Sequence, residues 1–349
     1  MKKYIEQLDT LPFSRPINFC KQIVILDGIS GTGKTMFTPI LSSFKRVQNA
    51  RFEYMIEYLC ICAQKLKMSP DAAHTLLNLL ADLKCYDGMI SREVNFRPND
   101  LSSVFKSNKT LKYFKQLWMN DGQAIEARIQ NENPILCLTT HQLMSCLNPA
   151  FDSYKDRLRV IETVRHPLYL LDHWVTYIEM FGNNVRDFTV WCEYEGESIP
   201  WFAEGWEDDY LHATIYDRVI YTIEHLMKKV FSMAISKEKA DQLLFIPFEK
   251  FVLEPDPYIK ELEKHISTER SSSTNKILKK QRVPRGNINA GPQKSIYKRY
   301  GVKKQDRTIP HAQDYEMRYN SAKQKSSASA FDVIEKISKK YEEVFGLWY

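Results

Sequence analysis

The feature that most constrains this chain is a glycine-rich loop directly after an apolar run. The loop reads Gly28-Ile-Ser-Gly-Thr-Gly-Lys-Thr35 and follows the run Ile23-Val-Ile-Leu-Asp27. Glycines allow turn conformations that other residues avoid, so that successive N–H groups can point at one anion. A helix that begins at the end of the loop adds the positive end of its dipole. The pattern therefore predicts a strand, a phosphate-binding P-loop and a helix.

The side chains of this loop suit a bound nucleotide. Lys34 brings a mobile positive charge to a terminal anionic group, and the Thr35 hydroxyl can serve a magnesium ion or a phosphate. The residues expected to bind the donor are Gly28, Ser30, Gly31, Thr32, Gly33, Lys34 and Thr35. Because kinases, GTPases, motor ATPases and sulfuryl transferases all use P-loops, the class of protein depends on later segments.

Short apolar runs alternate with amphipathic stretches along the rest of the chain. The runs 22–27, 135–139, 159–164 and 243–247 are typical of a parallel sheet that is covered on both faces. We expect an α/β fold with a P-loop NTPase-like parallel sheet flanked by helices, and a helical insert after the P-loop helix. A single domain over 1–349 is expected to contain that insert at about 51–130, an acceptor-side insert at about 182–240 and a basic lid at about 276–307.

Helical periodicity and small polar residues mark further local structure. Helices are expected at 51–67, at 71–83 after the Ser69-Pro70 start signal, at 212–234 and at 331–345. The segments 271–275 and 326–330 are rich in serine and predict flexible loops.

Composition narrows the partners and the compartment. The net charge is +6, from 49 basic and 43 acidic side chains, which predicts no nucleic-acid partner. The basic tract 276–307 has only Tyr297 and Tyr300 as aromatic residues, fewer than a groove for single-stranded nucleic acid needs, so a lid over the donor is the simpler interpretation. Seven cysteines without a CxxC pair suit reduced, buried thiols. With neither a secretion signal nor a membrane-spanning window, we expect a soluble cytoplasmic protein.

Three later segments carry candidate chemistry. The run 134–141 is a strand that ends in His141, which would lie at the same sheet edge as the P-loop and could take a proton from an acceptor hydroxyl. The run 159–167 is a strand that ends in Arg165, whose guanidinium can fork onto a phosphate. The run 243–255 predicts a strand that leads through an acidic turn to a helix.

Taken in order, these segments resemble the sulfotransferase family, from about residue 22 to about residue 300. The resemblance implies transfer of a sulfuryl group from 3′-phosphoadenosine 5′-phosphosulfate, with Thr140-His141 supplying the catalytic base. The family's loop lysine would fall at Gly31, and in this chain Lys34 is expected to supply the catalytic charge instead. It implies that Val164-Arg165-His166-Pro167 binds the 3′-phosphate, with His173 where the family has a serine. It also implies that Arg285-Gly286 belongs to a basic loop over that phosphate, and that no metal takes part.

Two other interpretations stay open. Lys34 occupies the position used by kinases and NTPases, so a P-loop kinase that uses ATP or GTP with magnesium is the alternative, although neither 135–139 nor 160–164 ends in an acid. A catalytically inactive nucleotide-binding module is the second.

The sequence indicates the chemical class of the acceptor but neither its identity nor the oligomeric state. The expected acceptor is a hydroxyl or amine of a carbohydrate or small molecule, because the aromatic segment 191–210 could stack on a sugar or enclose an apolar group. Packing of the segment 191–210 against the core explains these aromatic residues equally well. The acidic residues among them argue against a highly anionic acceptor.

Overall fold

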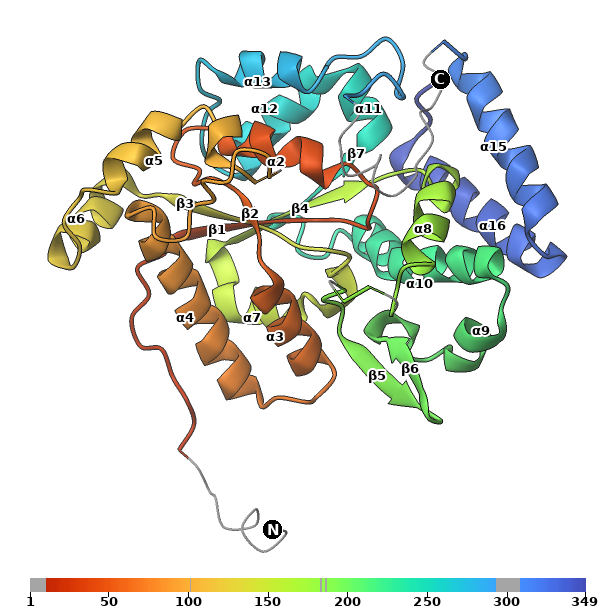
Figure 1. Cartoon of the computed structure of the whole chain (residues 1–349), viewed down its shortest axis with the longest axis horizontal. Coiled ribbons are helices and arrows are strands. Elements are labelled where there is room, and N and C mark those ends of the chain that lie inside the picture. The colour runs from red at the N-terminus through yellow and green to blue at the C-terminus, as the bar shows by residue number, and fades with distance from the viewer. Residues whose placement is uncertain (1–10, 101, 183, 186, 293–307) are drawn as a thin grey trace, which may run out of the picture.

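A parallel sheet forms the centre of the molecule (Figure 1). The computed structural model describes residues 11–292 and 308–349, apart from 101, 183 and 186. The sheet has five strands in the order β2-β3-β1-β4-β7. The strands are β1 (Gln22–Asp27), β2 (Arg51–Phe52), β3 (Ile135–Thr139), β4 (Leu158–Val164) and β7 (Leu243–Pro247). The predicted α/β class, a P-loop NTPase-like parallel sheet flanked by helices, is confirmed.

The register of the sheet brings three predicted segments together. Strand β1 pairs with β3 from Gln22 opposite Ile135, and with β4 as far as Asp27 opposite Glu162. These strands consist of almost continuous apolar residues because helices cover both faces of the sheet. Since parallel strands end at one edge, the segments that follow β1, β3 and β4 meet there.

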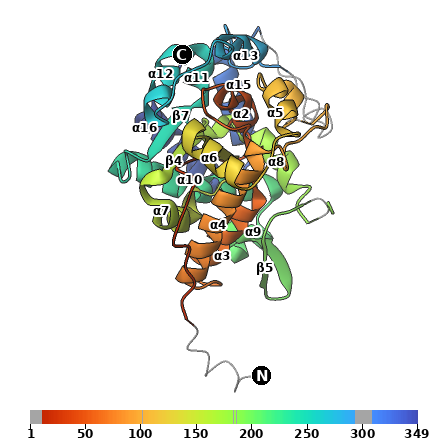
Figure 2. The same ribbon diagram turned by 90° about the vertical axis from the view of Figure 1, so that its left-hand side faces the viewer.

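Helices form a layer on each face of the sheet. Figure 1 shows α2, α12 and α13 on one face and α3, α4 and α7 on the other. Within the described part of the chain, the helices of at least six residues are α2 (Lys34–Ser42), α3 (Tyr54–Gln64), α4 (Pro70–Met89), α5 (Thr110–Gln116), α6 (Gln123–Glu132), α7 (Asn148–Tyr154), α8 (Leu171–Ile178), α9 (Glu207–His212), α10 (Ile215–Ser236), α11 (Phe248–Leu253), α12 (Pro255–His265), α13 (Thr274–Lys280), α15 (His311–Lys325) and α16 (Ala328–Phe345). Outside the sheet, β5 (Trp191–Tyr194) and β6 (Glu197–Pro200) form a hairpin that projects from the body in both views (Figures 1 and 2).

The expected helix at 51–67 is wrong at its start. Arg51 and Phe52 instead pair with β3, opposite Leu138 and Thr139, and extend the sheet by one edge strand. The Glu53 side chain then accepts a hydrogen bond from the Met55 N–H and caps α3. Pairing across the sheet overrides the local helical pattern at these two residues, and it places α3 at the carboxyl edge.

Both expected flexible loops contain the start of a helix. Thr274 is fully buried in the first turn of α13, and Ser327 caps α16 by accepting from the Ala330 N–H. Short polar side chains favour helix N-termini as well as loops, because they can accept hydrogen bonds from the first N–H groups. The predicted serine-rich segments are therefore partly helix caps.

All seven cysteines are free, and five of them are buried. Among the described residues, no helix combines the length and apolar character that a membrane crossing needs. The predicted helical insert contains α3 to α6, and the predicted acceptor-side insert contains the hairpin, α9 and α10. Residues 293–307 of the predicted basic lid lie outside the described residues. The single-domain division stays a prediction.

Candidate active site

The P-loop joins β1 to α2 and makes close contacts that only glycine permits. Gly33 has φ +98°, and a Cβ placed on it would lie 2.5 Å from the Phe248 ring. Gly31 has φ +94°, and its Cβ would lie 2.9 Å from the His173 ring. A larger residue would therefore be strained and would clash at either position. The loop backbone is free to approach a ligand closely at these two turns.

Lys34 and Thr32 shape the loop from within. The Lys34 ammonium donates hydrogen bonds to the carbonyl oxygens of Gly28 and Ile29. Burial lowers the pKa of Lys34, against the raising effect of nearby acids. Thr32 is buried, and its hydroxyl lies 2.8 Å from the Thr163 hydroxyl. Lys34 lines the large cavity described below, whereas the Thr32 side chain supports the loop.

His141 follows β3 and is held in a fixed orientation. Its Nδ1 lies 2.9 Å from Oε1 of Glu57, and its backbone N–H donates to the same oxygen over 3.0 Å. Its ring stacks between Phe52, at a centroid distance of 5.0 Å, and Tyr54, at 5.7 Å. Because a carboxylate can only accept, it places the imidazole proton on Nδ1 and leaves the lone pair on Nε2. This arrangement suits a general base.

Glu57 is the site residue that the sequence analysis missed. It lies on α3, 84 residues before His141, and is 8% exposed. Burial raises the pKa of its carboxyl, while hydrogen bonding and the charge of His141 lower it. The sequence signal was available: Glu57 is the one charged residue in the run Tyr54-Met-Ile-Glu-Tyr-Leu-Cys-Ile-Cys62. A lone acid in an apolar helix predicts a buried partner.

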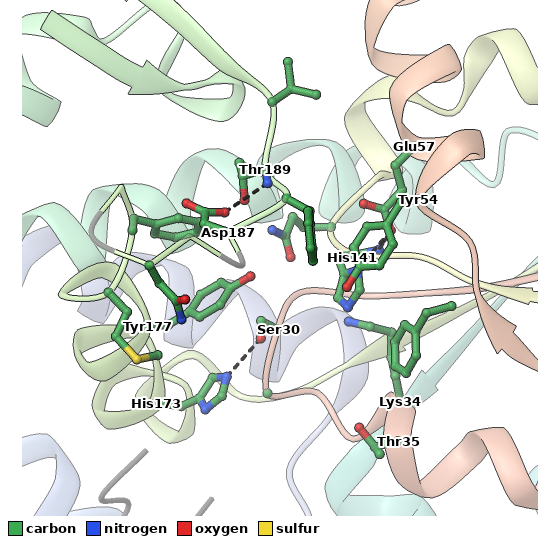
Figure 3. Close-up of a pocket in the computed structure, with 18 of the residues that line it drawn as sticks. Ser30, Lys34, Thr35, Tyr54, Glu57, His141, His173, Tyr177, Asp187 and Thr189 are labelled. Atoms are coloured by element: carbon green, nitrogen blue, oxygen red, sulfur yellow. Dashed lines mark hydrogen bonds and ion pairs between the residues drawn. The ribbon is translucent and has the colours of Figure 1, made fainter. Parts of the chain in front are cut away.

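One cavity brings the P-loop and His141 together. Its volume is about 560 Å³, and its lining includes Ser30, Lys34, Thr35, Glu57 and His141. Figure 3 shows Lys34 and His141 on the same side of this cavity, with Glu57 beside His141. Segments that end β1 and β3 therefore line one cavity with α3.

Arg165 and Arg285 share an aromatic surface next to the P-loop. The Arg165 guanidinium lies 4.6 Å from the centroid of the Phe248 ring, and that of Arg285 lies 5.5 Å from the same centroid. Arg165 also donates to the Gly31 carbonyl over 3.0 Å. Phe248, the first residue of α11, thus brings together two cations that are 120 residues apart in the sequence. Together these cations form a positive region beside the loop.

His173, on α8, contacts the P-loop at Ser30. Its Nε2 lies 2.9 Å from the Ser30 hydroxyl, and burial together with the nearby Arg165 lowers its pKa to about 4. His173 is therefore neutral at physiological pH. Figure 3 shows it across the cavity from Lys34 and His141. Gly286 follows Arg285 but lies outside this cavity's lining.

Two acids lie beneath the loop. Asp27 ends β1 and faces Glu162 across the β1–β4 pair. Both oxygens of Asp27 accept hydrogen bonds, one from the Thr140 hydroxyl and one from the Leu143 N–H. Burial and the charge of Asp27 raise the pKa of Glu162 well above its usual range. Asp27 thus joins the end of β1 to the segment that carries His141.

Trp201 and Trp206, both in the aromatic segment 191–210, differ in position. Trp201 lines the cavity. Trp206 stacks on His225 at a centroid distance of 4.6 Å and donates its ring N–H to the Phe202 carbonyl. Only Trp201 is placed to touch a ligand there.

Comparisons with known proteins give matches among solved structures. No protein-family model and no curated protein matches the chain. The sulfotransferase domain of the Synechococcus PCC 7002 olefin synthase aligns over 94% of this chain and 98% of that domain, at 11% identity and a TM-score of 0.42. The sulfotransferase domain from the curacin biosynthetic pathway aligns over 91% and 97%, at 10% identity and a TM-score of 0.43. Sulfotransferase STF1 from Mycobacterium tuberculosis H37Rv aligns over 80% and 74%, at 14% identity and a TM-score of 0.37.

All three of these solved structures are sulfotransferases or sulfotransferase domains.

Proposed function

We propose that this protein is a sulfotransferase that moves a sulfuryl group from 3′-phosphoadenosine 5′-phosphosulfate to a hydroxyl or amine of an acceptor. The observation that carries the proposal is one cavity lined by both a P-loop and a histidine held by a carboxylate. The order of the sequence motifs supports the same family. A general base next to an anion-binding loop is what group transfer to a hydroxyl requires.

The residues around the loop fit the proposed donor. Loop N–H groups and the N-terminus of α2 would bind the 5′-phosphosulfate, and glycine at 31 and 33 allows close approach. Arg165 and Arg285, both against Phe248, would bind the 3′-phosphate. When bound, the donor supplies the sulfuryl group.

Side chains of the protein then accept the acceptor's proton and stabilise the charges that develop during transfer. Nε2 of His141 accepts the proton that the acceptor loses. Glu57 holds the ring through Nδ1 and stabilises the positive charge that develops on it. Lys34 stabilises negative charge near the loop.

A kinase is the second candidate, because Lys34 and the acids Asp27 and Glu162 lie together at the loop. In their observed environments, Asp27 and Glu162 are both poor ligands for magnesium. Asp27 already accepts two protein hydrogen bonds, and the raised pKa of Glu162 favours its neutral form. Sulfuryl transfer therefore fits the site better.

Calorimetry on the full chain tests the donor. We expect 3′-phosphoadenosine 5′-phosphate to bind without metal, and more tightly than ATP or GTP with magnesium. At 100 times its dissociation constant it should stabilise the fold by about 2.7 kcal/mol. Arg165→Gln should weaken this ligand more than AMP, which lacks the 3′-phosphate. Arg159→Gln, at the opposite end of β4 from Arg165, should change neither.

Turnover distinguishes the alternatives. Activity with 3′-phosphoadenosine 5′-phosphosulfate should survive EDTA, whereas inhibition that magnesium reverses would favour the kinase. Tight nucleotide binding without turnover for any acceptor would favour the inactive module.

A further inference from the structure

A fully buried carboxylate holds Arg165 from the side of α11. Glu249 is the second residue of α11 and is 0% exposed, and its Oε1 lies 3.8 Å from Nε of Arg165. The same oxygen accepts a hydrogen bond from the backbone N–H of His166 over 3.1 Å. Because a buried charge is costly unless it is paired and hydrogen-bonded, these contacts fix the position of the carboxylate. Glu249, in the acidic turn predicted after β7, thus joins that turn to the two residues that follow β4.

Helix α16 holds the other oxygen of Glu249. Tyr341 on this helix is fully buried, and its hydroxyl donates a hydrogen bond to Oε2 of Glu249 over 2.9 Å. Burial and the charge of Glu249 raise the pKa of Tyr341 well above its usual range, so the hydroxyl stays protonated and acts as the donor. With one oxygen bonded to His166 and the other to Tyr341, Glu249 cannot rotate without breaking a buried hydrogen bond.

The next residue of α16 contacts the same segment. Oε1 of Glu342 lies 3.3 Å from Nε2 of His166 and accepts a hydrogen bond from the Tyr315 hydroxyl over 2.8 Å. His166 is fully buried, and the rings of Tyr315 and Tyr341 lie edge-on to it at centroid distances of 5.4 and 5.2 Å. Helix α16 also packs against the turn Pro167–Tyr169. Two successive residues of α16 therefore support the segment that follows β4.

Orientation and charge at Arg165 have opposite consequences for a bound phosphate. The guanidinium lies against the Phe248 ring and donates to the Gly31 carbonyl, and Glu249 adds a further constraint on its direction. A side chain that is already oriented loses less conformational freedom when it forks onto a phosphate. The negative charge of Glu249, in contrast, offsets part of the attraction between Arg165 and that phosphate. A carboxylate at this position therefore favours phosphate binding only by orienting the guanidinium.

From these contacts we infer that Tyr341 is a positioning residue for the 3′-phosphate of the donor. It acts through Glu249, whose carboxylate orients Arg165, and α16 thereby contributes to the selection of a 3′-phosphorylated nucleotide. This inference rests on the proposed function, in which Arg165 binds that phosphate. Tyr341 lies beyond the segment, up to about residue 300, that resembles the sulfotransferase family, so the sequence motifs did not indicate this role.

The nucleotide affinity of the full chain tests the role of Tyr341. Tyr341→Phe removes one hydroxyl and keeps the ring, so that Oε2 of Glu249 loses its donor. Calorimetry should show an increase of about 5- to 10-fold in Kd for 3′-phosphoadenosine 5′-phosphate, the effect of losing one hydrogen bond of ordinary strength. Kd for AMP, which lacks the 3′-phosphate, should stay unchanged. A structural defect alone would weaken both nucleotides equally.

Two variants of Glu249 separate orientation from charge. Glu249→Gln removes the charge but keeps the length of the side chain, and its amide can still bond to both His166 and Tyr341. Glu249→Asp keeps the charge and withdraws the carboxylate from Tyr341 by one methylene. If orientation decides, Glu249→Asp should raise Kd for 3′-phosphoadenosine 5′-phosphate about 10-fold, and more than Glu249→Gln does. The reverse order would overturn the inference.

Coupling to Arg165 tests the route. In the Arg165→Gln background, Tyr341→Phe should cause no further loss of affinity for 3′-phosphoadenosine 5′-phosphate, because no guanidinium is left to orient. Tyr154→Phe is the matched control. Tyr154 is 1% exposed, its hydroxyl donates to the Leu77 carbonyl over 3.0 Å, and it lies on α7, near the opposite end of β4 from Arg165. This control should lower the melting temperature and leave both nucleotide affinities unchanged.

The outcomes distinguish this inference from the proposed function. Suppose that 3′-phosphoadenosine 5′-phosphate binds and that Arg165→Gln weakens it. If Tyr341→Phe then binds like the wild type, weakens AMP equally or loses the same factor in the Arg165→Gln background, the inference is wrong and the proposed function stands. If the wild type does not bind the nucleotide, or Arg165→Gln leaves its affinity unchanged, the proposed 3′-phosphate site is wrong as well. If Tyr341→Phe does not fold, the order of the two Glu249 variants decides.

Discussion

Replacing Glu57 by glutamine removes one charge from the proposed base while keeping the size of the side chain. Oε1 of Glu57 contacts both Nδ1 and the backbone nitrogen of His141, at 2.9 and 3.0 Å. The amide oxygen of glutamine can still accept both hydrogen bonds. What is lost is the negative charge that stabilises a protonated His141.

The expected size of the effect follows from the two kinds of hydrogen bond. A bond to a charged group contributes roughly 1.5–3 kcal/mol, against about 1 kcal/mol for a neutral one. The loss is therefore about 0.5–2 kcal/mol, which is roughly 2- to 30-fold in kcat/KM. Glu57→Ala removes the whole contact and should cost about 10- to 150-fold. His141→Ala should cost about two to four orders of magnitude.

Release of 3′-phosphoadenosine 5′-phosphate measures kcat/KM, and thermal unfolding corrects for the folded fraction. Glu53→Gln is the control, since Glu53 is also buried near the start of α3 but pairs with Lys84. Because burial raises the pKa of Glu57, its carboxylate gains a proton at higher pH than an exposed one. The ratio of wild-type to Glu57→Gln activity should therefore shrink as pH falls.

The double variant decides whether Glu57 acts through His141. If it does, Glu57→Gln should have little further effect once His141 is alanine. A wild-type rate for Glu57→Gln, or the same fold-loss in both backgrounds, would refute the assigned role.

Three further predictions concern the P-loop and His173, which contacts it. Lys34→Ala should lower kcat much more than nucleotide affinity, because the positive charge of Lys34 stabilises the negative charge that develops in the transition state. Equal losses of kcat and of nucleotide affinity would contradict a catalytic role. Gly33→Ala should lower both the melting temperature and nucleotide affinity, since its Cβ would meet Phe248 at 2.5 Å. Gly122 also has positive φ but lies in open space, so Gly122→Ala should cost only backbone strain, of about 1–3 kcal/mol, and leave nucleotide affinity unchanged. The pKa of about 4 for His173 lies below its unfolded value of about 6.5, so the unfolded chain binds the extra proton and stability should fall as pH drops from 6.5 to 4. The contribution is at most about 3 kcal/mol, because the ring is only half-buried and water screens it; urea titrations of His173→Gln across this range should show a flatter pH dependence, and an unchanged slope would contradict it.

The sequence determined the parts of the site that depend on local pattern. The P-loop could be predicted because glycine spacing and the apolar run before it are short-range features. The approach of His141 to Lys34 could be predicted because parallel strands end at one edge, so that two strand ends suffice to place two residues there.

Only the tertiary structure decided which residues support these groups. Glu57 meets His141 across 84 residues of sequence, and it does so because Arg51 and Phe52 pair with β3 instead of starting a helix. Phe248 brings Arg165 and Arg285 to one ring in the same long-range way. Such contacts depend on how separate elements pack, and neither hydrophobic periodicity nor residue spacing encodes that packing. The sequence therefore determined the loop and the strand ends, and the packing of α3 and α11 decided what surrounds them.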